Sequence, residues 1–146
     1  MRPSFFEQFP TIRDLSDYLA THPETAGTTA TKFIATNLPK ESAFQRDIIK
    51  AVRQWVEEKS ISPSMFLWKH TAGVYQSNGL PDLMMVCDGR FFAFEVKRPY
   101  VGRQTTLQFK TIESINAAGG HAAIVSYPSE VRTLLQAAGV WKGAEK

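Results

Sequence analysis

Two acids and a lysine lie on neighbouring apolar segments of this chain. Asp82 directly precedes the apolar run Leu83–Cys87, and the next run carries Glu95 and Lys97 two positions apart. Carboxylates bind divalent cations, and a bound cation makes water a nucleophile at neutral pH. A lysine beside such a centre can orient that water or stabilise the charge that develops in the transition state. Metal-dependent cleavage of a phosphodiester bond requires this combination of residue types.

The turn dipeptide Asp88-Gly89 joins the two apolar runs and predicts a β-hairpin. Side chains alternate between the two faces of a strand. Every second residue from Phe92 to Val96 should therefore share the apolar face, while Glu95 and Lys97 share the other. Asp82 begins the partner strand, so it should lie at the same end of the hairpin. Three ionisable groups are thus expected to converge at one end of an apolar ribbon.

Each of the three groups also has a structural explanation. Asp82 follows Pro81 and could be an ordinary turn acid, and Lys97 could be a lysine on an edge strand. Glu95 is harder to explain in this way, because an unpaired buried acid costs several kcal/mol. Lys97 could be its partner in a simple ion pair, and a metal ion would be a better one. The residues favour a metal site and leave the ion pair as the alternative.

Several segments extend this pattern in a fixed order. They are Glu41-Ser42-Ala43-Phe44-Gln45, Gly79-Leu80-Pro81-Asp82-Leu83, Asp88-Gly89-Arg90, Glu95-Val96-Lys97 and Thr106-Leu107-Gln108. Together they resemble the VRR-NUC (virus-type replication-repair nuclease) branch of the PD-(D/E)xK nuclease superfamily. The resemblance covers residues 41 to about 127 and not the first forty. It implies a restriction-endonuclease-like α/β fold, with a mixed sheet of about four strands flanked by helices in the order α-β-β-β-α-β-α.

The resemblance also implies a metal-dependent DNA endonuclease whose product carries a 5′-phosphate. Asp82 and Glu95, with the carbonyl of Val96 and with Glu41, would bind one or two Mg²⁺ or Mn²⁺ ions. Lys97 would serve the attacking water. From periodicity alone, Glu41 would instead be a first-turn acid that complements the helix dipole.

Two glutamines complete the expected site. In the family, a glutamine matching Gln108 orients the active site or contacts the scissile phosphate, whereas the ordinary role of such a residue is a solvated helix position. Gln45 lies one helical turn after Glu41 and is expected to support it.

Basic residues lie close to these segments. Phosphates supply most of the sequence-independent affinity of DNA-binding proteins, so cations beside an acidic centre suit DNA. Arg98 and Arg103 follow the strand of Glu95 and are the strongest candidates, although any single lysine or arginine is usually solvated surface. His70 could contact a phosphate or carry a proton, and a lone histidine more often does neither. The predicted DNA-binding residues are Lys69, His70, Arg98, Arg103 and Lys110.

The form of the DNA substrate stays open. Short members of the family resemble Holliday-junction resolvases, act as homodimers and often come from phages, which implies a branched DNA substrate. The aromatic N-terminus and the chain end around Val140 and Trp141 offer apolar surface for a dimer. The alternatives are a general or nicking nuclease on linear DNA, a catalytically silent DNA-binding module, and a structural protein with a chance motif.

Composition sets wider bounds. A chain of 146 residues with a net charge of +3 is large enough for a core and permits a nucleic-acid partner. We divide it into an N-terminal extension, 1–38, made of a short helix and a loop, and a nuclease domain, 39–146. The single Cys87 excludes an internal disulfide framework. No apolar run reaches the ~18 to 20 residues of a membrane span, and no signal-peptide pattern is seen, so we expect the cytoplasm, of a bacterial host if the chain is phage-encoded.

The remaining elements follow from apolar periodicity and helix caps. A helix capped by Thr11 should bury Ile12, Leu15 and Leu19, and the helix after Thr105 should bury Phe109, Ile112 and Ile115. The expected helices are 10–20, 39–58, 105–118 and 129–138, the strands outside the hairpin are 65–70 and 121–126, and residues 21–37 should form a loop.

Overall fold

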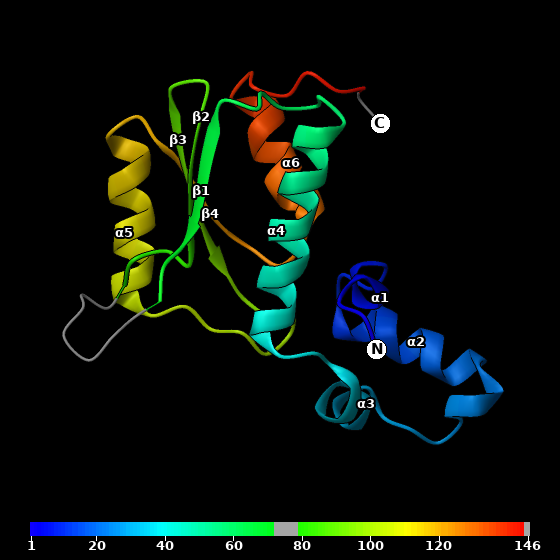
Figure 1. Ribbon diagram of the computed structural model, residues 1–146. Helices are drawn as coiled ribbons and strands as arrows, with labels where there is room; N and C mark the ends of the chain where they lie inside the picture. The colour runs from blue at the N-terminus through cyan, green and yellow to red at the C-terminus, as the bar shows by residue number, and fades with distance from the viewer. Residues whose placement is uncertain (72–78, 145–146) are drawn as a thin grey trace.

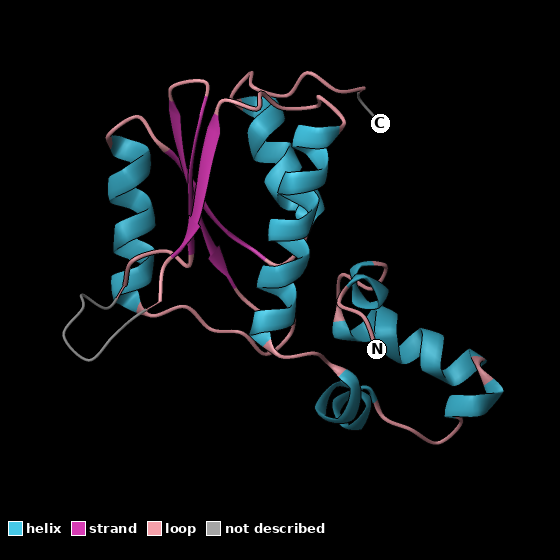
Figure 2. Ribbon diagram, viewed as in Figure 1, coloured by secondary structure: helices cyan, strands magenta, loops and turns pink. Residues whose placement is uncertain are grey.

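A mixed β-sheet between two layers of helices forms the larger part of the molecule (Figures 1 and 2). The computed structural model describes residues 1–71 and 79–144. Helix α5 (Thr106–Ala117) covers one face of the sheet, and α4 (Glu41–Glu57) and α6 (Pro128–Ala137) cover the other. The four strands are β1 (Met65–Lys69), β2 (Leu83–Cys87), β3 (Arg90–Val96) and β4 (His121–Val125).

The strands lie in the order β1-β2-β3-β4. β1 pairs with β2 and β2 with β3 in antiparallel fashion, whereas β3 and β4 are parallel. Parallel neighbours need a crossover connection, which α5 supplies. The predicted order of helices and strands from 39 onward, and with it the predicted fold class, is confirmed.

The hairpin of β2 and β3 has the predicted register and turn. Asp88 and Gly89 take φ values of 50° and 74°, as a type I′ turn requires. Leu83 lies opposite Phe94, which places the start of β2 beside the end of β3. Phe92, Phe94 and Val96 are fully buried on the side of α4 and α6, so the predicted alternation is confirmed.

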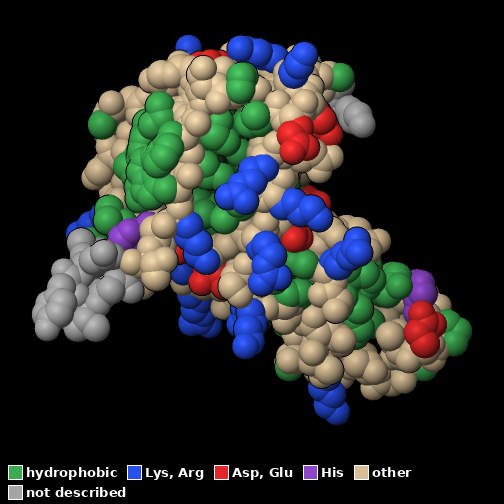
Figure 3. Space-filling model, in the orientation of Figure 1, with side chains coloured by type: hydrophobic (Ala, Val, Ile, Leu, Met, Phe, Trp, Pro, Cys, Tyr) green, Lys and Arg blue, Asp and Glu red, His purple; other side chains and the backbone are tan. Residues whose placement is uncertain are grey.

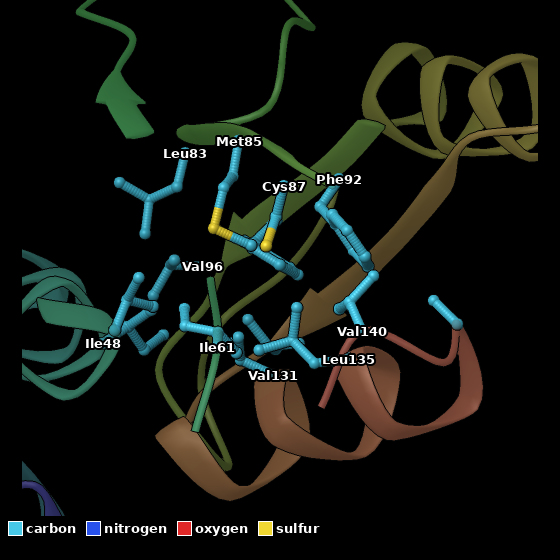
Figure 4. Close-up of a cluster of buried hydrophobic side chains, with 14 of the residues drawn as sticks. Ile48, Ile61, Leu83, Met85, Cys87, Phe92, Val96, Val131, Leu135 and Val140 are labelled. Atoms are coloured by element: carbon cyan, nitrogen blue, oxygen red, sulfur yellow. The ribbon is translucent and has the colours of Figure 1, made fainter. Parts of the chain in front are cut away.

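The two faces of the sheet have unequal cores. The main core lies under α4 and α6 and is drawn in Figure 4, and it includes Ile48, Met85, Cys87, Phe92 and Leu135. The core under α5 is small, with Ala93, Ile112 and Ala122 as its buried residues.

The prediction that α5 buries Phe109 is wrong, because this side chain is 48% exposed. The helix packs mainly on β4 and β3, and Ile112 is its one buried residue, with Ile115 half-buried. The buried strip of α5 is therefore narrower than its apolar sequence suggests.

The N-terminal region is a small helical module with its own core. It contains α1 (Ser4–Glu7), α2 (Ile12–Thr21), a 3-10 turn η1 (Pro23–Thr25) and α3 (Ala30–Asn37). Its buried residues are Phe6, Phe9, Leu15, Leu19, Ala30, Phe33 and Ile34, which we call the N-terminal cluster.

Two predictions for this module need correction. Thr11 caps α2 as predicted, but Ile12 is 48% exposed. The loop expected over 21–37 is wrong from Ala30 onward, where α3 forms. Thr29 caps that helix, Phe33 meets the ring of Phe6 in α1, and both Phe33 and Ile34 are buried in the N-terminal cluster. Within the described residues, no helix combines the length and apolar character that crossing a membrane demands.

Candidate active site

Glu95 is the buried centre of the site. It lies near the end of β3 and is 2% exposed. Gln108 Nε2 donates a hydrogen bond of 2.8 Å to Glu95 Oε1, and Lys97 Nζ lies 3.4 Å from the same oxygen. The other oxygen, Oε2, is buried and has no hydrogen-bond partner in the part of the chain that the structure describes. Half of this carboxylate is therefore satisfied by protein groups, and half is not.

Asp82 lies across the hairpin from Glu95, as predicted. Its Oδ2 accepts a hydrogen bond of 2.8 Å from the backbone N–H of Val96, which fixes the side chain at the end of β3. Burial raises the pKa of Glu95, the negative charge of Asp82 raises it as well, and Lys97 lowers it, so that the net result is a pKa of about 7. Two carboxylates held together in this way require a proton or a cation between them.

The glycine of the Gly79-Leu80-Pro81-Asp82 segment has a steric function. Gly79 has φ of 97°, and a Cβ built on it would lie 2.5 Å from Cγ of Leu107. A larger residue would force either the Leu107 side chain or the segment to shift, and its positive φ would be strained. Gly79 thus holds the approach to Asp82 close to the helix that carries Gln108.

Gln108 is fixed at both ends of its amide. Its Oε1 accepts from the backbone N–H of Thr105 at 2.9 Å, and its backbone N–H donates to Thr105 Oγ1, so the two residues form a capping box. With Oε1 turned toward the backbone, Nε2 faces Glu95. The sequence-predicted Gln108 is therefore brought to the site, and the helix cap determines which end of the amide reaches the carboxylate.

Lys97 lies between two acids. Its Nζ is 3.4 Å from Glu95 Oε1 and 3.8 Å from Glu41 Oε1. Burial raises the pKa of Glu41, the charge of Lys97 lowers it, and Asp82 raises it. Glu41, in the first turn of α4, therefore faces the site as predicted. Gln45 is buried one turn further along the same helix, and its supporting role stays a prediction.

The donor set fits a magnesium-like cation. Mg²⁺ usually binds through one or two carboxylates and keeps several waters. The pair of Asp82 and Glu95 supplies two carboxylates, and one buried oxygen of Glu95 has no hydrogen-bond partner among the residues that the structure describes. Within residues 1–71 and 79–144, no group of three or more His, Cys, Asp and Glu is arranged to hold a metal ion. Glu41 forms an ion pair with Lys97 and does not join Asp82 and Glu95 in a group of three acids among the described residues, so its role as a metal ligand stays a prediction.

Cations surround the acidic centre on one side. Arg98, Arg103 and Lys40 line a hollow of about 390 Å³ together with Glu41, Lys97 and Gly102. Figure 3 shows lysine and arginine side chains gathered over α4 and over the loop between β3 and α5, which runs below α4 in this view. Lys40 was not among the DNA-binding residues predicted from the sequence. Its position at the N-cap of α4, directly before Glu41, was the available indication.

The three other predicted DNA-binding residues lie at different distances from the centre. Lys69 is exposed at the end of β1, opposite Leu83. His70 donates its backbone N–H to the carbonyl of Asp82 at 2.8 Å, and its Nε2 is buried with no partner among the described residues. Lys110 is exposed two residues after Gln108, a separation that places the two on opposite sides of α5. The structure thus brings His70 next to Asp82 and leaves Lys110 away from the centre.

Among solved structures, the chain is similar to one described as "VRR_NUC domain", with 19% sequence identity and a TM-score of 0.43. The match covers 62% of this chain and 95% of the other. This neighbour carries the family name of the resemblance found in the sequence, while a phage origin stays a prediction. No family model matches the chain, and no curated protein matches it.

Proposed function

We propose that this protein is a divalent-metal-dependent DNA endonuclease. The observation that carries the proposal is the state of Glu95, a buried carboxylate beside a second acid, with one oxygen held by Gln108 and Lys97 and the other without a partner among the described residues. A simple ion pair with Lys97 does not account for this arrangement, because it leaves Oε2 and the nearby charge of Asp82 uncompensated.

The residues divide the chemistry among them. Asp82 and Glu95, with the main-chain carbonyl of Val96, would hold Mg²⁺ or Mn²⁺, which when bound lowers the pKa of water and polarises a phosphate oxygen. Gln108 keeps Glu95 Oε1 engaged, and Oε2, which has no hydrogen-bond partner among the described residues, would be the oxygen that binds the cation. Lys97 places its ammonium group beside the same centre, where it stabilises negative charge that develops on the phosphate.

The basic rim suits a polyanionic substrate. Lys40, Arg98 and Arg103 line the hollow next to Lys97, so phosphates flanking the reacting one would meet them. We include in the proposal a preference for branched DNA and a homodimer, since resolving a four-way junction needs two symmetric cuts.

Several apolar side chains that the sequence offered for a dimer surface are buried within the chain, and the dimer itself stays a prediction. Phe6 is fully buried, Phe9 is 7% exposed and Val140 is 2% exposed, because these side chains fill the cores of their own chain. Large apolar side chains are exposed elsewhere, with Phe66 at 64% and Val86 at 39% on paired positions of β1 and β2. We propose that a dimer would use this exposed surface of β1 and β2.

The test is a cleavage assay with Mg²⁺ or Mn²⁺ on linear, nicked, flap and four-way DNA. We expect metal-dependent cutting that falls by about 10²-fold or more in Asp82→Asn, Glu95→Gln and Lys97→Met, by analogy with the loss of one electrostatic group in other active sites. Glu113→Gln is the matched control, since Glu113 is an exposed acid on α5.

Near-normal cleavage by any of the three folded site variants would overturn the assignment. Wild-type protein that binds DNA without cutting it, with either metal, would favour the silent binding module. A monomer by light scattering that cuts linear and four-way DNA equally would favour the general nuclease.

A further inference from the structure

The loop that follows β3 is tied to the N-terminal module by one side chain. Tyr100 donates its hydroxyl proton to the carbonyls of Phe9 and Phe6, with oxygen–oxygen distances of 2.5 Å and 3.2 Å. Its ring also meets that of Phe6 edge to face, with the ring centroids 6.3 Å apart. A residue three positions after Lys97 is thus partly buried against the N-terminal cluster.

The loop holds a backbone conformation that needs this support. Tyr100 has φ of 66°, in the left-handed region, which a residue with an aromatic side chain rarely adopts. The loop then closes tightly, because Gly102 donates its N–H to the carbonyl of Arg98 at 3.1 Å. A Cβ at Gly102 would lie 2.5 Å from that same oxygen and 2.9 Å from Cβ of Lys97. The unfavourable φ persists because contacts on both sides of it fix the loop.

The same loop carries the basic rim of the site. Arg98 and Arg103 bracket Tyr100 in sequence, and both line the hollow that contains Lys97 and Glu41. The docking of Tyr100 therefore determines where the two guanidinium groups lie relative to the acidic centre. If the loop were released from the N-terminal module, both arginines would remain in the chain but would no longer be held side by side at the hollow.

We propose that Tyr100 is a positioning residue that docks the 98–103 loop on the N-terminal module and thereby sets the arginines for DNA phosphates. Residues 1–38 then belong to the substrate-binding apparatus of the enzyme rather than serving only as a cover for apolar surface. This inference rests on the proposed function, since the arginines are assigned to phosphates there. Tyr100 itself touches no reacting group.

The test uses the full chain with Tyr100→Phe, which removes only the hydroxyl and retains the ring. Tyr127→Phe is the matched control, because Tyr127 also packs on the N-terminal cluster but lies outside the loop. Binding of a DNA duplex is measured by anisotropy without divalent metal, over a series of salt concentrations, and cleavage is measured as separate kcat and KM values.

We expect Tyr100→Phe to raise Kd and KM by about three- to tenfold and to change kcat less than about twofold. The slope of log K against log salt should become shallower by about one to two, as expected when one or two phosphate contacts are lost. In an Arg98→Ala/Arg103→Ala background, adding Tyr100→Phe should change Kd and KM little, because Tyr100 acts on DNA binding through the two arginines. Tyr127→Phe should bind like the wild type.

The outcomes separate this inference from the proposed function. If the wild type cuts DNA but Tyr100→Phe matches Tyr127→Phe in Kd, KM and salt slope, the positioning role is overturned and the nuclease stands. If the wild type binds DNA without cutting it, the nuclease proposal fails and the Kd and salt-slope comparison still decides the role of Tyr100. If the wild type does neither, both are overturned. A lower Tm for Tyr100→Phe with unchanged Kd and salt slope makes Tyr100 merely structural, which also overturns the inference.

Discussion

Glu95 and Arg103 lie on two sides of one site, in opposite surroundings. Glu95 is 2% exposed between the sheet and α5, and it is held by Gln108 and Lys97. Arg103 is exposed on a loop, at the edge of the hollow that it shares with Lys40. The acidic centre is built from Glu95 in β3, Gln108 in α5 and two residues that adjoin strand ends, Asp82 and Lys97, whereas the basic rim is built from a loop and a helix terminus.

Because of this difference, electrostatic interactions should be strong in the buried centre and weak on the exposed rim. Charges in the centre interact through a low dielectric and are weakly screened, so a single substitution there should have a large effect. Charges on the rim are hydrated and screened by salt, so each should contribute modestly and in a salt-dependent way. The centre therefore suits chemistry and the rim suits affinity, and three predictions test that division in descending order of expected effect.

The largest effect concerns the stability of the metal-free protein and its dependence on pH. The pKa of Glu95 rises from 4.5 in the unfolded chain to about 7 in the fold, so the folded state holds the proton longer. Stability should therefore fall as pH rises from about 4.5 to about 7 and stay low above it. The raised pKa corresponds to about 3 kcal/mol at pH 8. Glu95→Gln cannot ionise, so it should not show this fall in stability as pH rises. Urea unfolding of both proteins at pH 5 and pH 8 would measure the difference.

The same experiment with Mg²⁺ present checks the cause of the shift. Metal should restore stability to the wild type at pH 8 by neutralising the acidic pair, and it should do so less for Glu95→Gln. If the stability of the two proteins depended on pH in the same way, Glu95 would not be the acid with the raised pKa. That result would remove the contrast between centre and rim.

Sequence patterns predicted the centre because its positions follow from local rules. The two-residue alternation of β3 placed Glu95 and Lys97 on one face, and the hairpin dipeptide placed Asp82 beside them. The helix cap at Thr105 placed Gln108 in the first turn of α5. The strand and hairpin rules act within a few residues and needed no knowledge of distant packing, whereas the expected site role of Gln108 came from the family resemblance and its contact with Glu95 depends on how α5 packs on the sheet.

The surroundings of the rim could not be predicted in this way. Residues 21–37 are rich in threonine and alanine and lack a clear apolar period, yet α3 forms because Phe33 and Ile34 are buried in the N-terminal cluster. The docking of Tyr100 on the carbonyl of Phe9 joins segments separated by 91 positions. The exposure of Phe109 likewise depends on which strands α5 covers. All three depend on tertiary contacts that periodicity does not encode.

An intermediate effect is expected for Glu41, which lies between the centre and the rim. Glu41→Gln should raise the Mg²⁺ concentration for half-maximal cleavage about tenfold, as loss of an outer partner does at other metal sites. The physical reason is that Lys97 lies between Glu41 and Glu95. Without the Glu41 carboxylate, Lys97 would pair with Glu95 only and would compete more strongly with the metal ion for it. A metal titration of the cleavage rate measures the effect.

Glu57→Gln, an exposed acid at the other end of α4, is the control for Glu41→Gln. If Glu41 only complements the helix dipole, its loss would cost about 0.3 to 1 kcal/mol of stability and leave the metal titration unchanged. An unshifted curve would therefore place Glu41 on the rim rather than in the centre.

The smallest effects are expected for the arginines of the rim. Arg98→Ala and Arg103→Ala should each weaken DNA binding by a few-fold and lower the salt slope of log K by about one, equally for unrelated sequences. The matched control is Arg90→Ala, because Arg90 is exposed at the turn end of the hairpin, away from Glu95. Anisotropy over a salt series measures all three. If Arg103→Ala left the slope unchanged and lowered kcat instead, that guanidinium would be acting on the reacting phosphate, and the boundary between centre and rim would have to move outward to include the loop.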